Sequence, residues 1–352
     1  MKQQKTNLTI KLLKLIGSPF DSEKVAPENC KILNFYNISV KNKIELLYLQ
    51  SLKQLGKLGN LGHIYEQRKK DYEVFLRTIV RTSNLLKEKG VNAIVFKTLM
   101  PFEIIPNDID MIILDKNAEY NAIIEFMIKN GFVVFDSVPH CTSLHDMRDI
   151  PHVDPNRKDP YDVDLYDEIS ANYVVYFDKS KLKTKIKTFE IDGEQAVVFY
   201  PEVDLAIQLV HSVFPEQLYT LLHYFAVLHC LSQINENVFI RVLQENHVTV
   251  PVKETLALTA NLHEMAYGFV PSKLENILKS LEVTDWKRLD PFGSWTLPCR
   301  FNLMTVAKVL FEKSLEMVTL KSLALQLTKM LSPSLMQHVV RHVAIRRIRV
   351  TY

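Results

Sequence analysis

The chain has 352 residues, of which 47% are hydrophobic and 24% are charged. These values are typical of a globular protein with a substantial core, and they exclude a largely disordered chain. The formal net charge is only +3, so no overall electrostatic field marks the protein as a nucleic-acid binder.

No feature of the sequence predicts export or a membrane. Lys11 and Lys14 interrupt the apolar stretch near the N-terminus, and no small-residue cleavage site follows it. The most apolar later stretch, residues 218–234, is too short and too polar to span a bilayer. The four cysteines form no C-x-x-C pair and are typical of free thiols in a reducing compartment. We therefore expect a cytoplasmic protein without membrane contact.

The first 89 residues carry mainly helical patterns. Residues 1–40 predict a short amphipathic helix and an irregular link, and residues 42–57 and 61–89 predict two further helices. In the last of these, apolar side chains recur every three or four positions, and Gly90 supplies a helix stop. We expect residues 1–89 to form an N-terminal helical segment that packs on the core.

Residues 90–200 predict a small mixed sheet. Strand patterns cover residues 91–96, 109–114, 132–138 and 161–166, with a helix over 117–129. The polar stretch 139–160 predicts a loop or irregular hairpin. Residues 183–191 and 195–200 flank Asp192-Gly193, which indicates a hairpin.

After Pro201 the pattern becomes helical throughout. The predicted helices cover residues 203–213, 217–234, 238–244, 253–267, 272–281, 303–318, 320–331 and 334–348. The expected fold class is therefore α+β, with an α/β core over residues 90–200 and a C-terminal helical domain over residues 201–352.

Two carboxylates stand at the start of the second predicted strand. The two-residue period of a strand sends Asp108 and Asp110 to one face and Ile109 and Met111 to the other. Two close like charges beside an apolar strand repel each other and resist desolvation. A divalent cation would offset both costs, and hard cations prefer carboxylate oxygens. The pattern therefore predicts a metal site.

A third carboxylate lies on the strand over residues 161–166. Catalysis of phosphoryl or nucleotidyl transfer by two metals uses carboxylates from neighbouring strands to hold ions ~3.5–4 Å apart. Asp164 and Asp162 share a face of that strand, and Asp164 is the preferred ligand because it lies between Val163 and Leu165.

Three short motifs together resemble a known family. They are Phe96-Lys97-Thr98-Leu99, Asn107-Asp108-Ile109-Asp110 with the apolar residues after it, and Val163-Asp164-Leu165-Tyr166. In this order they resemble the nucleotidyltransferase superfamily with the DNA polymerase β-like fold, and look closest to a poorly characterised prokaryotic branch of it. The resemblance covers roughly residues 70–235 and implies a nucleotidyltransferase-like core over residues 90–200.

The resemblance implies an enzyme that binds an NTP with Mg²⁺ or Mn²⁺ and moves the nucleoside monophosphate onto an acceptor hydroxyl. Asp108 and Asp110 would hold both ions, Asp164 would complete the catalytic metal site, and Lys97 and Thr98 would steady the phosphates. The acceptor could be an RNA such as a tRNA end, a protein side chain or a small molecule.

One departure from the family keeps a second hypothesis open. The superfamily normally has Gly-Gly or Gly-Ser after the first strand, whereas this chain has Lys97-Thr98 and no glycine from residue 91 to 130. A Cβ where the backbone must approach phosphate hinders binding. The alternative is therefore a nucleotidyltransferase-like module that has lost turnover and binds or regulates.

The carboxylates also have simpler interpretations. Asp108 could belong to an Asx turn after Pro106-Asn107, and Asp162 and Asp164 could line the exposed face of an edge strand. A D-x-D glycosyltransferase is disfavoured because mostly helix precedes residue 91.

Other polar groups carry weaker signals. The loop residues His140, His145, His152 and Asp154 fit no standard zinc spacing. Arg157 and Lys158 could meet a phosphate, or they could be solvated loop charges. The basic cluster over residues 341–349 predicts either contact with RNA phosphates or a solvated helix end.

Overall fold

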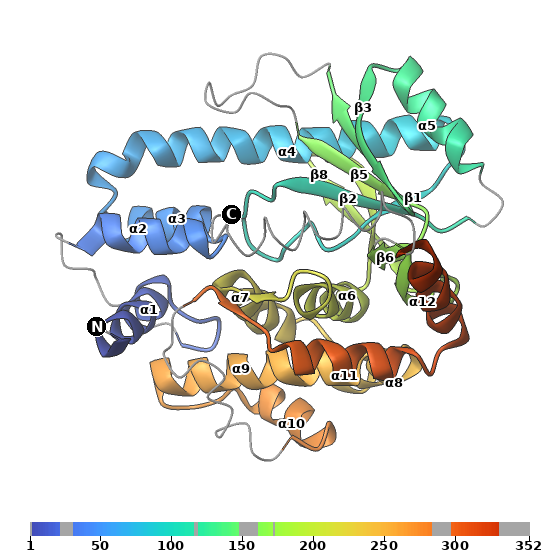
Figure 1. Ribbon diagram of the computed structural model, residues 1–352. Coiled ribbons are helices and arrows are strands. Elements are labelled where there is room, and N and C mark those ends of the chain that lie inside the picture. The colour runs from blue at the N-terminus through green and yellow to red at the C-terminus, as the bar shows by residue number, and fades with distance from the viewer. Residues whose placement is uncertain are drawn as a thin grey trace.

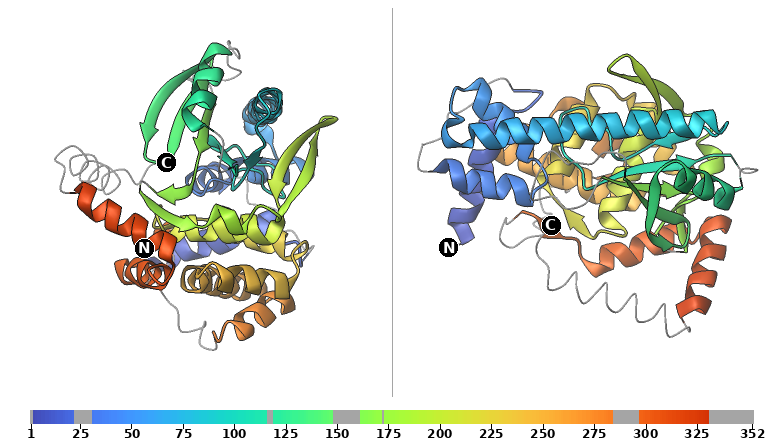
Figure 2. Two further views of the ribbon diagram at one scale, coloured as in Figure 1. Left: turned by 90° about the vertical axis from the view of Figure 1, so that its right-hand side faces the viewer. Right: turned by 90° about the horizontal axis from the view of Figure 1, so that it is seen from above.

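The computed structural model describes residues 2–21, 31–115, 119–147, 161–171, 173–283 and 297–330. The protein is a mixed α+β structure, as predicted, and its centre is a seven-stranded sheet of mixed direction. Helices cover both faces of this sheet (Figure 1). Viewed along α4 (Gly62–Glu88), the sheet separates α4 from the layer of C-terminal helices (Figure 2, left).

Among the residues that the structure describes before the sheet are the α-helices α1 (Lys2–Ile16), α2 (Ile32–Lys41), α3 (Glu45–Gln54) and α4. α2 occupies part of the stretch predicted to be an irregular link, because Phe35 gives it a residue to bury. α4 packs on strands of the sheet, whereas α1 packs against α9 (Thr249–Tyr267) of the C-terminal layer, where the Tyr267 hydroxyl donates to the Leu13 carbonyl at 2.7 Å.

The main sheet contains β1 (Ala93–Val95), β2 (Asp108–Ile113), β3 (Phe132–Val138), β4 (Cys141–Asp146), β5 (Asp162–Tyr166), β8 (Ile186–Ile191) and β9 (Glu194–Phe199), with α5 (Tyr120–Lys129) between β2 and β3. The spatial order is β3-β4-β5-β2-β1-β9-β8. β2 runs parallel to β5 and β1 parallel to β9, and the other neighbours are antiparallel.

The sheet is larger than predicted because the polar stretch 139–160 contributes β4, which lies between β3 and β5. A separate ribbon of β6 (Ile169–Ala171) and β7 (Val174–Phe177) follows β5 and was not expected. Its short strands are buried but lack the alternation that predicts a strand. Helix α12 (Met317–Met330) packs against β7.

The two faces of the sheet belong to different cores. Ile109, Met111 and Val163 point to one face, where α4 and α5 cover them. Ile94 and Ile112 point to the other face and join the larger core built by the N-terminal and C-terminal helices. The even-numbered residues of β2, including its two aspartates, therefore face the C-terminal layer.

The C-terminal layer contains α6 (Pro201–Val213), α7 (Leu221–Leu231), α8 (Glu236–Glu245), α9, α10 (Ser272–Ser280), α11 (Leu303–Lys313) and α12. A two-residue strand, β10 (Leu218–Tyr219), pairs with β11 (Cys299–Arg300) where the helix over 217–234 was expected to begin. The predicted helix over 334–348 and the basic cluster over 341–349 lie outside the described residues. Within the described part of the chain, no helix combines the length and hydropathy needed to cross a bilayer.

Candidate active site

The aspartates of β2 and β5 lie side by side on one face of the sheet. Asp110 is the direct register partner of Asp164, and Asp108 is the partner of Asp162. Paired residues of neighbouring strands point to the same face, so the register brings the predicted ligands Asp108, Asp110 and Asp164 together. Burial of the intervening apolar residues against α4 and α5 fixes this orientation.

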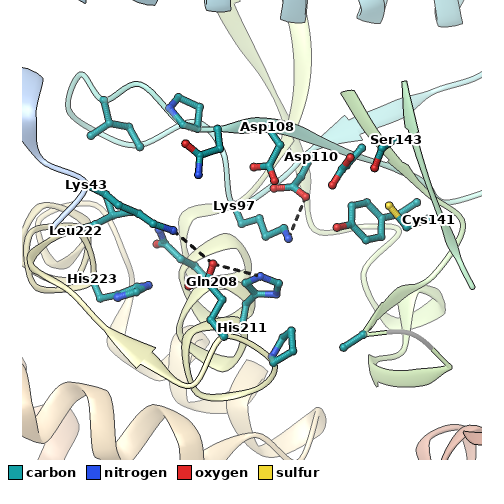
Figure 3. A pocket seen from close by; sticks show the side chains of 18 of the residues that line it. Lys43, Lys97, Asp108, Asp110, Cys141, Ser143, Gln208, His211, Leu222 and His223 are labelled. Atoms are coloured by element: carbon teal, nitrogen blue, oxygen red, sulfur yellow. Dashed lines mark ion pairs between the residues drawn. The ribbon is translucent and has the colours of Figure 1, made fainter. Parts of the chain in front are cut away.

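A pocket of about 840 Å³ opens between this face and the helices opposite. Asp108, Asp110 and Asp164 line one wall. The opposite wall comes from α6, α7 and the turns around residues 43 and 216, and it includes Lys43, His211, Glu216 and His223. Figure 3 shows that Lys97 extends between the two walls toward Asp110.

Lys97 is held in place through both its backbone and its side chain. Its backbone has a φ of 49°, and its N–H donates to the Oδ1 of Asp204, a half-buried residue on α6, at 2.6 Å. Its Nζ lies 2.9 Å from Asp110 Oδ1, and the two side chains are only 9% and 6% exposed. The lysine predicted to steady phosphates therefore pairs with a predicted metal ligand.

Thr98 contacts both the backbone and the side chain of Asp110. Its hydroxyl accepts a hydrogen bond from the Asp110 backbone N–H at 3.0 Å and lies 3.3 Å from Asp110 Oδ2, to which it donates. Thr98 is buried and is not part of the pocket lining. The structure thus places its hydroxyl against the Asp110 carboxylate, outside the lining of the pocket.

The charges of this wall are strongly coupled. Burial, together with the nearby Asp108 and Asp164 carboxylates, raises the pKa of Asp110, while Lys97 opposes the rise. Burial and the charge of Asp108 raise the pKa of Asp164 to about 6. Burial alone would lower the pKa of Lys97, but the Asp110 carboxylate outweighs it and the pKa is raised. Lys97 therefore stays protonated, and the carboxylates favour additional positive charge.

The donor chemistry of this wall suits a hard divalent cation, because it offers three carboxylates. Asp110 Oδ1 is buried with no well-aligned hydrogen-bond donor, and the Lys97 ammonium is its ionic partner. Among the residues that the structure describes, no group of three or more His, Cys, Asp and Glu side chains is arranged to hold a metal ion. At Asp110 a metal ion would compete with the Lys97 ammonium, which lies 2.9 Å from Oδ1.

The opposite wall carries a charge cluster that the sequence did not predict. Glu216 Oε1 lies 3.5 Å from Lys43 Nζ and 3.8 Å from His211 Nε2, and dashed lines mark both ion pairs in Figure 3. The Tyr176 hydroxyl lies 3.1 Å from His211 Nδ1. Burial would raise the pKa of Glu216, but Lys43, His211 and His223 outweigh it and lower the pKa to about 2. Glu216 is therefore ionised at neutral pH.

Backbone strain also concentrates at this pocket. Lys43, Lys97 and Gln217 all line it, and their φ angles of 59°, 49° and 54° lie in the left-handed region. Such conformations cost of order 1–3 kcal/mol each for residues other than glycine and recur at functional sites. No local sequence motif marks these positions, since they come from three distant turns.

The two described histidines of the stretch 139–160, His140 and His145, contact different carboxylates. His140 Nδ1 lies 2.9 Å from Asp167, and His145 Nε2 lies 2.8 Å from Asp162. His152, Asp154, Arg157 and Lys158 lie outside the described residues, as does Cys30. The described cysteines are free thiols (Cys141, Cys230 and Cys299), and Cys141 lines the pocket beside Ser143.

The resemblance to nucleotidyltransferases rests on the motifs of the chain alone. The function must be inferred from the chemistry of the pocket itself. Comparison with family models, curated proteins and solved structures finds no match to this chain.

Proposed function

We propose that the chain is a metal-dependent nucleotidyltransferase, which moves the nucleoside monophosphate of an NTP onto an acceptor hydroxyl and releases pyrophosphate. The observation that carries the proposal is the direct pairing of Asp110 with Asp164 on parallel strands, with Asp108 on the same face. This arrangement provides three carboxylates at the wall of one pocket. Folding alone does not explain why charged groups occupy this face of a central strand.

Asp108, Asp110 and Asp164 would hold Mg²⁺ or Mn²⁺. When bound, such an ion neutralises charge that develops on the phosphate oxygens. Asp164 is less buried than Asp110, and its Oδ atoms are therefore the better placed to accept the proton of the acceptor hydroxyl. Thr98 would keep Asp110 in position through the bonds described above.

The Lys97 ammonium would pair either with Asp110 or with a phosphate of the nucleotide. In the structure the ammonium pairs with Asp110. When phosphates enter the pocket, the ammonium would pair with a phosphate oxygen and free Asp110 for the metal ion, since lysine binds phosphate as a mobile point charge. Such an exchange would allow Lys97 to contact Asp110 and also to bind phosphate as expected.

The test measures transfer of label from α-labelled NTPs to total RNA and protein, together with release of pyrophosphate. Asp110→Asn and Asp164→Asn should each lower the rate roughly 100- to 1000-fold, the usual loss for one electrostatic contact to a transition state. Asp115→Asn is the matched control, because Asp115 is exposed and lies just beyond β2. Unchanged transfer in Asp110→Asn or Asp164→Asn would contradict the proposal for that residue.

A second candidate is a binding or regulatory module without turnover. Two observations favour it: Lys97 already neutralises Asp110, and no glycine lies between residues 91 and 130. Calorimetry with an NTP and Mg²⁺ separates the candidates. Heat of binding without pyrophosphate release supports the module, whereas binding with release supports the enzyme.

A further inference from the structure

An exposed aromatic side chain stands at the edge of the sheet beside the carboxylate wall. β3 is an edge strand, and its pairing with β4 shifts between Val134 and Asp136, which leaves Phe135 as the extra residue of a bulge. Phe135 is 68% exposed, far more than a phenylalanine that serves the core. Bulges at sheet edges commonly re-aim one side chain, often next to an active site.

The ring of Phe135 is supported from one side. It stacks on the His145 ring, with the ring centroids 4.5 Å apart and the planes inclined by 26°. The His145 side chain is only 11% exposed, and its Nε2 lies 2.8 Å from Asp162 Oδ1, although the two atoms are not aligned as a hydrogen bond. The pair is therefore a preformed flat surface with one ring largely accessible to solvent.

This surface lies at the end of a row that begins in the proposed metal site. Asp108 pairs with Asp162, and Asp162 pairs with His145, across β2, β5 and β4. Two strand spacings place the His145 backbone roughly 10 Å from that of Asp108. The neighbouring residues Asp136 and Val138 line the same pocket as the carboxylates.

We propose that Phe135, backed by His145, is the stacking surface for the base of the bound nucleotide. The inference rests on the proposed function, since it assigns the base to one end of a row whose other end would hold the phosphates. A nucleobase is the ligand that a supported, exposed aromatic ring recognises through its π-face. Stacking on a base would explain why the hydrophobic ring of Phe135 is exposed.

The test compares two ligands in the presence of Mn²⁺: a non-hydrolysable ATP analogue and inorganic tripolyphosphate, which lacks the base. Calorimetry should show that Phe135→Ala weakens binding of the ATP analogue about 5- to 150-fold, the equivalent of one base–aromatic stack. Binding of tripolyphosphate should not change. Phe135→Tyr should retain affinity, and Phe311→Ala is the control, because Phe311 is 74% exposed on the distant α11.

Each other outcome overturns the inference. Equal affinity of wild type and Phe135→Ala for the analogue would show that no base stacks there, while leaving the nucleotidyltransferase proposal intact. Equal weakening of both ligands would show a general effect on the pocket. If the wild type binds neither ligand, the stacking surface and the proposed function fail together.

Discussion

The Lys97–Asp110 pair provides the sharpest physical prediction. Both side chains are almost fully buried, and their charged atoms are 2.9 Å apart. Asp110→Asn would leave the Lys97 ammonium buried without its main counter-ion. Removal of one partner of a buried pair costs about 3–5 kcal/mol, whereas an exposed pair contributes ~0–1 kcal/mol. We therefore expect Asp110→Asn to lower the free energy of unfolding by about 3–5 kcal/mol.

The assay is urea unfolding at neutral pH with a chelator present, followed by circular dichroism. Lys97→Met should also destabilise the protein, because it leaves the Asp110 carboxylate buried among other carboxylates. The double variant buries neither charge, so its cost should fall short of the sum of the single costs by about 2–3 kcal/mol. Glu275→Gln supplies the exposed control, since its partner Lys279 lies at 3.0 Å but the two side chains are 46% and 67% exposed.

Two results would refute this reasoning. A cost for Asp110→Asn as small as that of Glu275→Gln would mean that solvent already screens the lysine. A double variant whose cost equals the sum of the two single costs would mean that the two groups do not interact. In either case the proposed exchange of Lys97 between carboxylate and phosphate would lose its basis.

Two further predictions concern pH. Burial raises the pKa of Asp204 to about 6, although the hydrogen bond from the Lys97 backbone opposes this rise. Between pH 4 and 6 the folded state therefore binds more protons than the unfolded state, and stability falls as pH rises through that window. Asp204→Asn should lessen this dependence of stability on pH in urea unfolding. Asp204→Ala also removes the acceptor of the Lys97 N–H, so it should lower the free energy of unfolding by about 1–3 kcal/mol. An unchanged slope in Asp204→Asn would show that Asp204 does not cause the pH dependence. Because the pKa of Glu216 is lowered to about 2, its contribution to stability is present above its ordinary pKa and is lost as pH falls toward 2. Glu216→Gln should flatten the acid side of the same stability curve, and an acid side identical to that of the wild type would exclude this role.

The sequence predicted those parts of the structure that local periodicity encodes. Alternation around Ile109 and Met111 indicated the strand, its buried face and the common face of Asp108 and Asp110, and the predicted strand over 132–138 coincides with β3. The α+β class and mixed sheet are confirmed. The sequence did not predict β4 as a strand, because its residues Thr142, Ser143 and His145 are polar and show no apolar alternation. These polar side chains lie beside the carboxylates of β5, and no short sequence pattern encodes that position.

Other features depend on contacts between distant segments. Lys43 meets Glu216 only after the helical layers pack, and neither residue belongs to a recognisable motif. The contact of Lys97 with Asp110 likewise depends on a left-handed backbone fixed by Asp204 from α6. A single sequence contains both partners of such pairs but no local signal that joins them.

The parallel register of β2 and β5 has a consequence for how this protein tolerates change. A slip of β5 by one residue would turn Asp164 toward α4 and α5 and put Val163 or Leu165 in its place. β5 is paired over five positions on each side, with β2 and with β4, so both neighbours oppose such a slip. An insertion or deletion inside β4 or β5 would dismantle the carboxylate row even where every aspartate is kept, so the spacing of these strands is as much a part of the site as the acidic side chains.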